Sequence, residues 1–266
     1  MLPRLLFLLC GLALLTAAPA HAMPAGAVTV SGKKADCLGG RGAPCASTVR
    51  GLMAPVAGAF TQDGRHFYVG SIAMGGLISM RRDPATGRLA PVQGGPGCIG
   101  YGEAGGYMEV AVAPDGRSVY AVAEGWNVHA FARDPATGAL TRIAGKRGCV
   151  GMAKGCAWLE GVFDPEDIRL SPDGRHIYLA ASGGVSVLRR EADGGMRQLP
   201  GKAGCVMVRH GEVVPYGKGR QCHTGAYESR NVSGLEIAPG GRHLYVLQSN
   251  SDGRYGTGVV QLMRRH

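Results

Sequence analysis

One phrase recurs four times along the chain and limits its fold more than any other feature. An apolar strand is followed by a tight turn of the Pro-Asp-Gly-Arg type and then by a second strand that carries a tyrosine. The four copies are Phe60–Val69, Val112–Ala121, Leu170–Leu179 and Ile237–Val246. Repeats of about 50 residues, each built from a few short strands, are typical of β-propellers, in which one repeat forms one blade. The sequence therefore predicts an all-β fold.

Each repeat continues into two further strands. A third strand of alternating apolar residues ends in a turn, written Asp-Pro-Ala-Thr-Gly in the first two repeats. A short fourth strand follows, beginning at Leu89, Leu140 and Met196 in the first three repeats. We therefore predict four-stranded antiparallel blades near residues 56–93, 108–144, 166–200 and 233–266.

The fourth repeat ends after its third strand, and residues 26–32 align with the fourth strands of the other repeats. We expect this N-terminal strand to complete the last blade and close a four-bladed propeller within one chain, because closure removes exposed sheet edges. The alternative is that the chain forms half of an eight-bladed dimer. The sequence favours the monomer.

Residues 1–22 have the layout of a signal peptide: Arg4, an apolar stretch from Leu5 to Leu15, and a small-residue site at 20–22. The apolar stretch is shorter than the ~20 residues that cross a bilayer. We expect residues 23–266 to form a single exported domain, periplasmic or secreted, with no membrane span.

The mature chain is basic, since removal of the leader lowers the formal net charge only from +10 to +9. A basic exported protein is attracted to anionic envelope polymers, which are therefore expected partners. Lys and Arg are nowhere interleaved with aromatic residues in a run. We expect no specific nucleic-acid partner.

Six of the seven cysteines in the mature chain form local pairs within the long connections between repeats. Disulfides are expected for Cys37 with Cys45, Cys149 with Cys156, and Cys205 with Cys222. An oxidising compartment favours such bonds, and the spacings of a zinc site are missing. Cys98 has no second cysteine in its own loop, which indicates a buried thiol, with an intermolecular disulfide or a reactive nucleophile as the alternatives. We expect neither a metal nor a cofactor.

The connections between repeats are long and variable, whereas the turns within repeats are short. Long loops on a rigid scaffold commonly carry binding residues, so we expect the functional face here. The longest connection spans residues 202–233. The candidate binding residues on this face are Trp158, Glu160, Arg209, His210, Tyr216, Arg220 and Tyr227.

Charged residues also occur in the first strands, which surround the centre of a propeller. Alignment on the turns places Glu109 and Asp167 at one level, and Arg169 and Glu236 at the next. One interpretation is a buried Arg169–Glu236 ion pair that holds the third and fourth blades in register. The other is a polar ligand site with Glu109 and Asp167 at its mouth. His223 is a further catalytic candidate.

The Pro-Asp-Gly-Arg-x-x-Tyr unit, the Arg-Asp-Pro-Ala-Thr-Gly-Ala-Leu segment and a Gly-Cys-Val loop resemble bacterial exported proteins of the lactonase-like, YVTN-type β-propeller group. The resemblance covers nearly the whole mature chain and implies a propeller. Lactonases of the group usually have seven blades, whereas this chain has room for four. No catalytic motif carries over.

We therefore expect an exported propeller that binds a protein, a glycan or a small-molecule ligand through its disulfide-stapled loop face. The alternative is a lactonase-like hydrolase acting at the central mouth. In that case Glu109, Asp167, Arg169, Glu236 or His223 would serve as acid, base or oxyanion partner. Whether the chain is an enzyme stays open.

Overall fold

The structure is a computed structural model of the chain, divided into residues 1–33 and residues 34–266. It describes residues 33–265, apart from 46, 74, 93–97, 101–105, 161–162, 208–221, 225–230 and 250–257. None of the described residues belongs to a helix long and apolar enough to cross a membrane.

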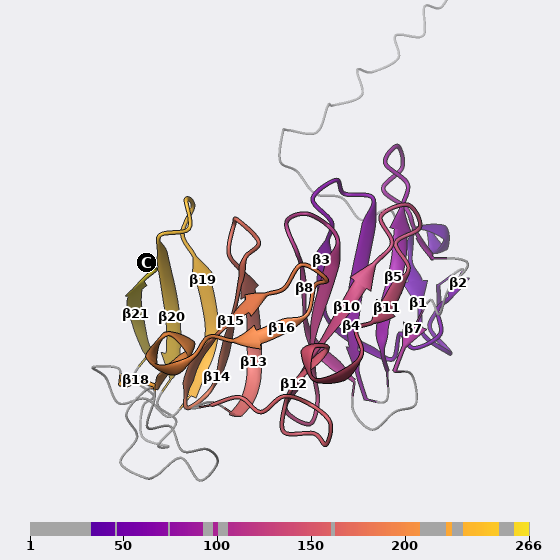
Figure 1. Cartoon of the computed structure of the whole chain (residues 1–266). Helices are drawn as coiled ribbons and strands as arrows, with labels where there is room; N and C mark the ends of the chain where they lie inside the picture. The colour runs from indigo at the N-terminus through magenta and orange to yellow at the C-terminus, as the bar shows by residue number, and fades with distance from the viewer. Residues whose placement is uncertain are drawn as a thin grey trace, which may run out of the picture. The chain divides into compact units, whose positions relative to one another are not determined.

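The described residues form antiparallel sheets in chain order, one for each repeat, and we call them blades 1 to 4 (Figure 1). Blade 1 contains β3 (Ala54–Phe60), β4 (His66–Ile72), β5 (Leu77–Arg82) and β6 (Leu89–Pro91); blade 2 contains β8 (Tyr107–Val112), β9 (Ser118–Ala123), β10 (Asn127–Arg133) and β11 (Leu140–Arg142). Blade 3 contains β13 (Phe163–Leu170), β14 (His176–Ser182), β15 (Gly184–Arg190) and β16 (Met196–Gln198); blade 4 contains β19 (Asn231–Ile237), β20 (His243–Ser249) and β21 (Gly258–Arg264).

The predicted all-β fold is confirmed, and the first three blades have the expected four strands. Blade 4 has three strands in the described part of the chain. The strand expected at 26–32 lies outside the described residues, as does the predicted signal peptide. Closure by that strand therefore stays a prediction.

The tight turns follow from their sequence. The carboxylates of Asp63, Asp115 and Asp173 each accept a hydrogen bond from the backbone N–H two residues on, at 3.0, 3.0 and 3.1 Å. The next residue is always glycine, with φ near +65°, a region that other residues rarely adopt. The Asp-Gly pair therefore fixes the turn between the first and second strands in blades 1 to 3.

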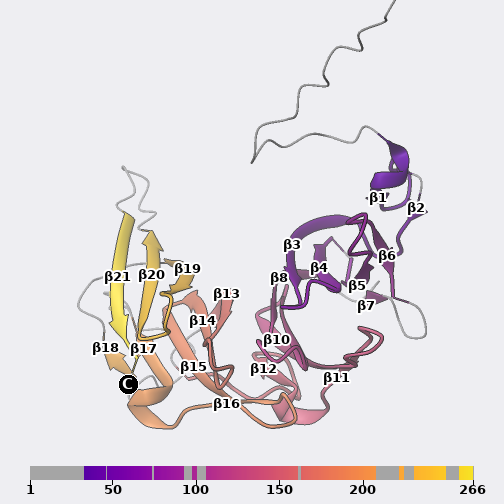
Figure 2. The same cartoon turned by 90° about the horizontal axis from the view of Figure 1, so that it is seen from above.

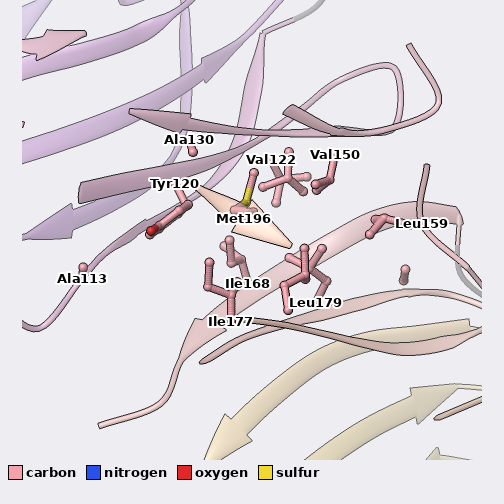
Figure 3. Close-up of a cluster of buried hydrophobic side chains, with 13 residues drawn as sticks. Ala113, Tyr120, Val122, Ala130, Val150, Leu159, Ile168, Ile177, Leu179 and Met196 are labelled. Carbon is pink, nitrogen blue, oxygen red and sulfur yellow. The ribbon is translucent and has the colours of Figure 1, made fainter. Parts of the chain in front are cut away.

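Adjacent blades pack face to face through apolar side chains, and Figure 2 shows each blade beside the next in chain order. Between blades 2 and 3, Tyr120 and Val122 lie against Ile177 and Leu179 (Figure 3). Met196 of the fourth strand joins the same cluster. Burial of alternate side chains on both faces of a sheet explains why the strands read as nearly continuous apolar runs.

A buried polar contact, which we call the latch, also joins each blade to the next. In the first latch, the Tyr68 hydroxyl of blade 1 donates to the Gly138 carbonyl oxygen of blade 2 at 2.9 Å. The buried Arg133 donates to the Tyr68 hydroxyl oxygen at 2.7 Å and to the Gly116 carbonyl oxygen at 2.7 Å. One tyrosine is thereby bound to both turns of the following blade.

The latch repeats with equivalent residues. Between blades 2 and 3, the Tyr120 hydroxyl donates to the Gly194 carbonyl oxygen at 2.8 Å and accepts from Arg190 at 3.1 Å. Between blades 3 and 4, the Arg265 guanidinium lies 5.6 Å from the centre of the Tyr178 ring. Hydrogen bonds from a guanidinium are stronger than neutral ones, so the latch fixes how far each blade is offset from the next.

A cysteine-stapled module precedes blades 1, 3 and 4, and each module contains a 3₁₀ turn, a short strand and a parallel return. The elements are η1 (Lys34–Asp36), β1 (Leu38–Gly39) and β2 (Ser47–Thr48); η2 (Gly145–Arg147) and β12 (Cys149–Gly151); and η3 (Gly201–Gly204), β17 (Cys205–Met207) and β18 (His223–Thr224). The three predicted disulfides, Cys37–Cys45, Cys149–Cys156 and Cys205–Cys222, are confirmed.

The connections between blades also add a strand that the sequence did not predict. β12 pairs with β10 and β17 pairs with β15, each antiparallel to the third strand of the preceding blade. β7 (Cys98–Ile99) pairs with β5 in the same way, and places Cys98 half-buried at the edge of blade 1. These connections are therefore anchored to the preceding blade by the added strand.

Replacing Arg190 by Lys is expected to lower the free energy of unfolding by about 1–3 kcal/mol, because an ammonium cannot reproduce the guanidinium's part-buried hydrogen bonds to Tyr120 and Ser118. Arg189→Lys, at the neighbouring position, is the matched control. The Arg189 side chain is 54% exposed, and its ion pair with Glu191 lies at the surface. Urea unfolding of both variants measures the difference. Equal stability of the two would contradict the latch.

Removing the Cys205–Cys222 disulfide by serine substitution is expected to cost more stability than removing Cys149–Cys156. The sequence separations are 17 and 7 residues, and loop-closure entropy gives costs of about 3 and about 2.5 kcal/mol. Urea unfolding of the two double variants would show the order. The reverse order would mean that disulfide entropy does not set the stability of these modules.

Candidate functional site

Charged side chains gather on the first strands of blades 2, 3 and 4, where three carboxylates surround one guanidinium. We call this group the Arg169 cluster; it comprises Glu109 on β8, Asp167 and Arg169 on β13, and Glu236 on β19. The strand register confirms the predicted levels. Arg169 pairs with Tyr178 and Glu236 with Tyr245, which are equivalent residues of blades 3 and 4.

A β-bulge occurs at the same place in all four first strands. A bulge bends its strand and redirects the side chains around it. The residue that resumes the pairing is Glu109 in blade 2 and Asp167 in blade 3, but Ala57 in blade 1 and Gly234 in blade 4. Two blades therefore present carboxylates at this level, and the other two leave space.

Arg169 lies at the centre of the cluster and is held by its own strand. Its Nη1 donates to the Asp167 carboxylate, and to the Ile168 carbonyl oxygen at 2.9 Å. The Glu109 and Glu236 carboxylates lie 3.8 and 3.7 Å from its nitrogens. The Arg169 side chain is 37% exposed and that of Glu236 is 70% exposed. This ion pair is therefore open to solvent, and not the buried pair considered from the sequence.

Asp167 joins blades 3 and 4. Its side chain is only 9% exposed, and its Oδ2 accepts a hydrogen bond from the Leu235 backbone N–H at 2.8 Å. Its Oδ1 accepts from the Ile168 N–H at 2.7 Å. A buried carboxylate needs such partners to offset the loss of water. The bridging role considered for Arg169 and Glu236 thus belongs to Asp167.

The pKa of Glu109 is raised above its ordinary value, first by burial and then by repulsion from the Asp167 carboxylate. Arg169 and the Val110 backbone N–H act in the opposite direction. A carboxyl group of this kind takes up a proton more readily than a surface glutamate, and its protonated form can donate a hydrogen bond.

The cluster differs in charge from the rest of the molecule. Three ionised carboxylates and one guanidinium leave two excess negative charges, in a chain of formal net charge +10. Anionic ligands are repelled at this point even though the surface as a whole attracts them. The arrangement instead offers hydrogen-bond acceptors on both sides of one exposed donor.

The other predicted site residues lie away from the Arg169 cluster or outside the described residues. His223 is on β18, at the opposite edge of the third sheet from β13, and lines a cavity of about 320 Å³ between blades 3 and 4. Trp158 is 46% exposed, and the exposed Glu160 is anchored by a 2.8 Å hydrogen bond from its N–H to Gln198 Oε1. The candidates Arg209, His210, Tyr216, Arg220 and Tyr227 lie outside the described residues.

Two contributions to the site were missed in the sequence. The hydrogen bond from Leu235 to Asp167 joins two repeats, and spacing within one repeat cannot show it. The bulge was also missed, because it depends on how two strands pair. The available signal was the carboxylate that replaces Ala57 or Gly234 at the equivalent position in blades 2 and 3.

No protein-family model matches the chain, and no curated protein sequence does. Solved structures do match it. A candidate 6-phosphogluconolactonase of Bacteroides uniformis is 17% identical, with a TM-score of 0.50, over 79% of this chain and 57% of that protein. A Lactobacillus plantarum protein is 18% identical, with a TM-score of 0.50, over 80% and 51%. The periplasmic gluconolactonase of Pseudomonas aeruginosa is 19% identical, with a TM-score of 0.48, over 79% and 57%.

The chain therefore spans a little over half of the length of these proteins. Identities of this size show likeness of fold and nothing about the reaction. The packed antiparallel blades and the structural matches together show that the chain has a β-propeller-type fold.

Proposed function

We propose that this chain is an exported propeller that binds a small, uncharged, polyhydroxylated ligand at the Arg169 cluster. The observation that carries the proposal is the partly exposed Arg169 guanidinium, with Glu109 and Glu236 beyond hydrogen-bonding distance at 3.8 and 3.7 Å. A hydroxyl group can accept from a guanidinium and donate to a carboxylate at once. Neighbouring hydroxyls of a sugar-like molecule would bridge the guanidinium and the carboxylates from the solvent side.

The charge of the cluster selects among ligands. Its two excess negative charges disfavour phosphorylated and carboxylated sugars, and leave neutral sugars, polyols and sugar lactones as the matching class. Anionic envelope polymers would be attracted only by the basic surface outside the cluster.

The loop face supplies the rim in this proposal. Three disulfides are typical of proteins that work outside the cytoplasm, where such ligands are encountered, and they support a periplasmic or secreted location. The exposed Trp158 offers an apolar ring face, the kind of surface that the apolar side of a sugar ring covers.

Hydrolysis of a neutral lactone is a second candidate function, and Glu109 is the observation that favours it. A carboxyl group with a raised pKa beside an exposed guanidinium can move a proton while the cation stabilises developing negative charge. The match to a candidate lactonase from Bacteroides uniformis supports testing this reaction.

Ligand binding is tested by calorimetric titration of the oxidised protein with neutral sugars, their lactones and the matching sugar acids. We expect binding of neutral members, and a loss of at least tenfold in affinity on Arg169→Gln, because one charge-assisted bond is worth about 1.5–3 kcal/mol. Arg175→Gln, on an exposed turn of the same blade, should bind like the unmodified protein. Tighter binding of the sugar acids, or unchanged binding by Arg169→Gln, would refute the proposal.

The protonation of Glu109 is tested through stability. Its pKa is raised in the folded state, so its contribution favours folding below the ordinary value of 4.5 and is lost as the pH rises through the folded pKa. As the pH increases from 4 to 7, the melting temperature of the unmodified protein should fall relative to that of Glu109→Gln. Melting curves of both proteins across that range measure the difference, and parallel curves would exclude a raised pKa.

A further inference from the structure

Four apolar side chains are exposed on one face of blade 4, at positions that are buried in blade 2. The exposed fractions are 38% for Tyr245, 45% for Leu247, 64% for Val260 and 50% for Leu262. Their equivalents by strand register in blade 2, all 0% exposed, are Tyr120, Val122, Val128 and Ala130. In blade 2 this face packs against blade 3 (Figure 3), so in blade 4 it is a docking face without its partner in the described chain.

Blade 1 carries the complementary half. A pocket of about 450 Å³ opens on its outer face, lined by Val56, Phe67, Val69, Met80 and Leu89 among others. The equivalents in blade 3 of the last four are Ile177, Leu179, Leu188 and Met196. Those four side chains receive Tyr120 and Val122 of the preceding blade. The pocket is therefore equivalent to the surface of blade 3 that packs against blade 2, but in blade 1 no preceding blade of the described chain fills it.

The latch is divided in the same way. Arg82 ends the third strand of blade 1, as Arg133 ends that of blade 2. Its guanidinium lies beside Gly64 and Gly87, the glycines of the two turns, as Arg133 lies beside Gly116. No hydrogen bond to a tyrosine hydroxyl is recorded for Arg82 within the described part of the chain. Tyr245 is the fourth tyrosine of the series and the matching half.

The first module is already placed to receive a blade. Asp36 of η1 pairs with Arg88 of the blade 1 turn at 2.7 Å, and Arg147 of η2 pairs with Asp193 of the blade 3 turn at 2.9 Å. β12 and β17 each pair with the third strand of a preceding blade. Among the described residues, β1 pairs only with β2. The register of β12 on β10 predicts Leu38 opposite Val260.

We propose that blade 4 of one copy of this chain docks on blade 1 of a second copy, continuing the interface that already joins blades 1 to 4. The partner's tyrosine at position 245 would enter the blade 1 pocket and bind Arg82 and the Gly87 carbonyl oxygen. Two such contacts close two copies into one symmetric ring. A second copy fits better than the chain's own blade 1, because the blade 4 face is exposed and the blade 1 pocket is open, and because one chain covers a little over half of the matching structures.

The proposal is tested by light scattering of the full-length mature, oxidised protein during size-exclusion chromatography. We expect twice the mass of one chain. Leu262→Lys and Val56→Lys, one on each face and both at exposed positions, should each raise the dissociation constant at least 100-fold and give single chains with an unchanged circular dichroism spectrum. Trp126→Lys is the matched control, a similarly exposed apolar residue (42%) outside both faces, and should stay dimeric.

Mixing the two variants separates docking between copies from closure within one chain. Leu262→Lys keeps an intact blade 1 and Val56→Lys keeps an intact blade 4, so the mixture should recover a dimer through one sound interface. Closure within a chain, by the strand expected at 26–32, would give single chains for the unmodified protein and no recovery on mixing. That result, or a dimer that neither substitution weakens, would overturn the proposal.

Discussion

The buried tyrosine hydroxyl that bridges two blades is the contact on which the rest of the structure depends. A buried hydroxyl or guanidinium left without partners costs about 1–3 kcal/mol or more, so two blades can dock only at the offset that satisfies every donor and acceptor. That offset, set by Tyr120 with Arg190 and by Tyr178 with Arg265, brings the first strands side by side. Only then does the Leu235 N–H reach Asp167, and the Arg169 cluster exists.

The strands and disulfides were predictable because their signals are local. Alternation of apolar residues and an Asp-Gly turn such as Asp115-Gly116 determine a hairpin within about twenty residues, and paired cysteines in one loop leave few alternatives. The added strands could not be predicted in this way. β7 and β12 are two and three residues long, each begins with a cysteine, and neither shows alternation.

The candidate site was predictable in position but not in detail. Alignment of the repeats placed Glu109, Asp167, Arg169 and Glu236 at the correct levels, since strand register follows from the turns. Solvent access does not follow from register. Arg169 prefers the neighbouring Asp167 on its own strand, which leaves Glu236 exposed and makes Asp167 the link between blades.

The four repeats keep the latch-type tyrosine and vary the residue paired with it on the first strand: Ala59, Ala111, Arg169 and Glu236. Blade packing and the proposed ligand contacts therefore use different side chains of the same strand pair. Mutations at this one level, the two alanines included, alter the chemistry presented to a ligand without replacing a tyrosine or arginine that holds the blades together. Such a scaffold can acquire a new specificity by single substitutions, at a stability cost confined to one blade.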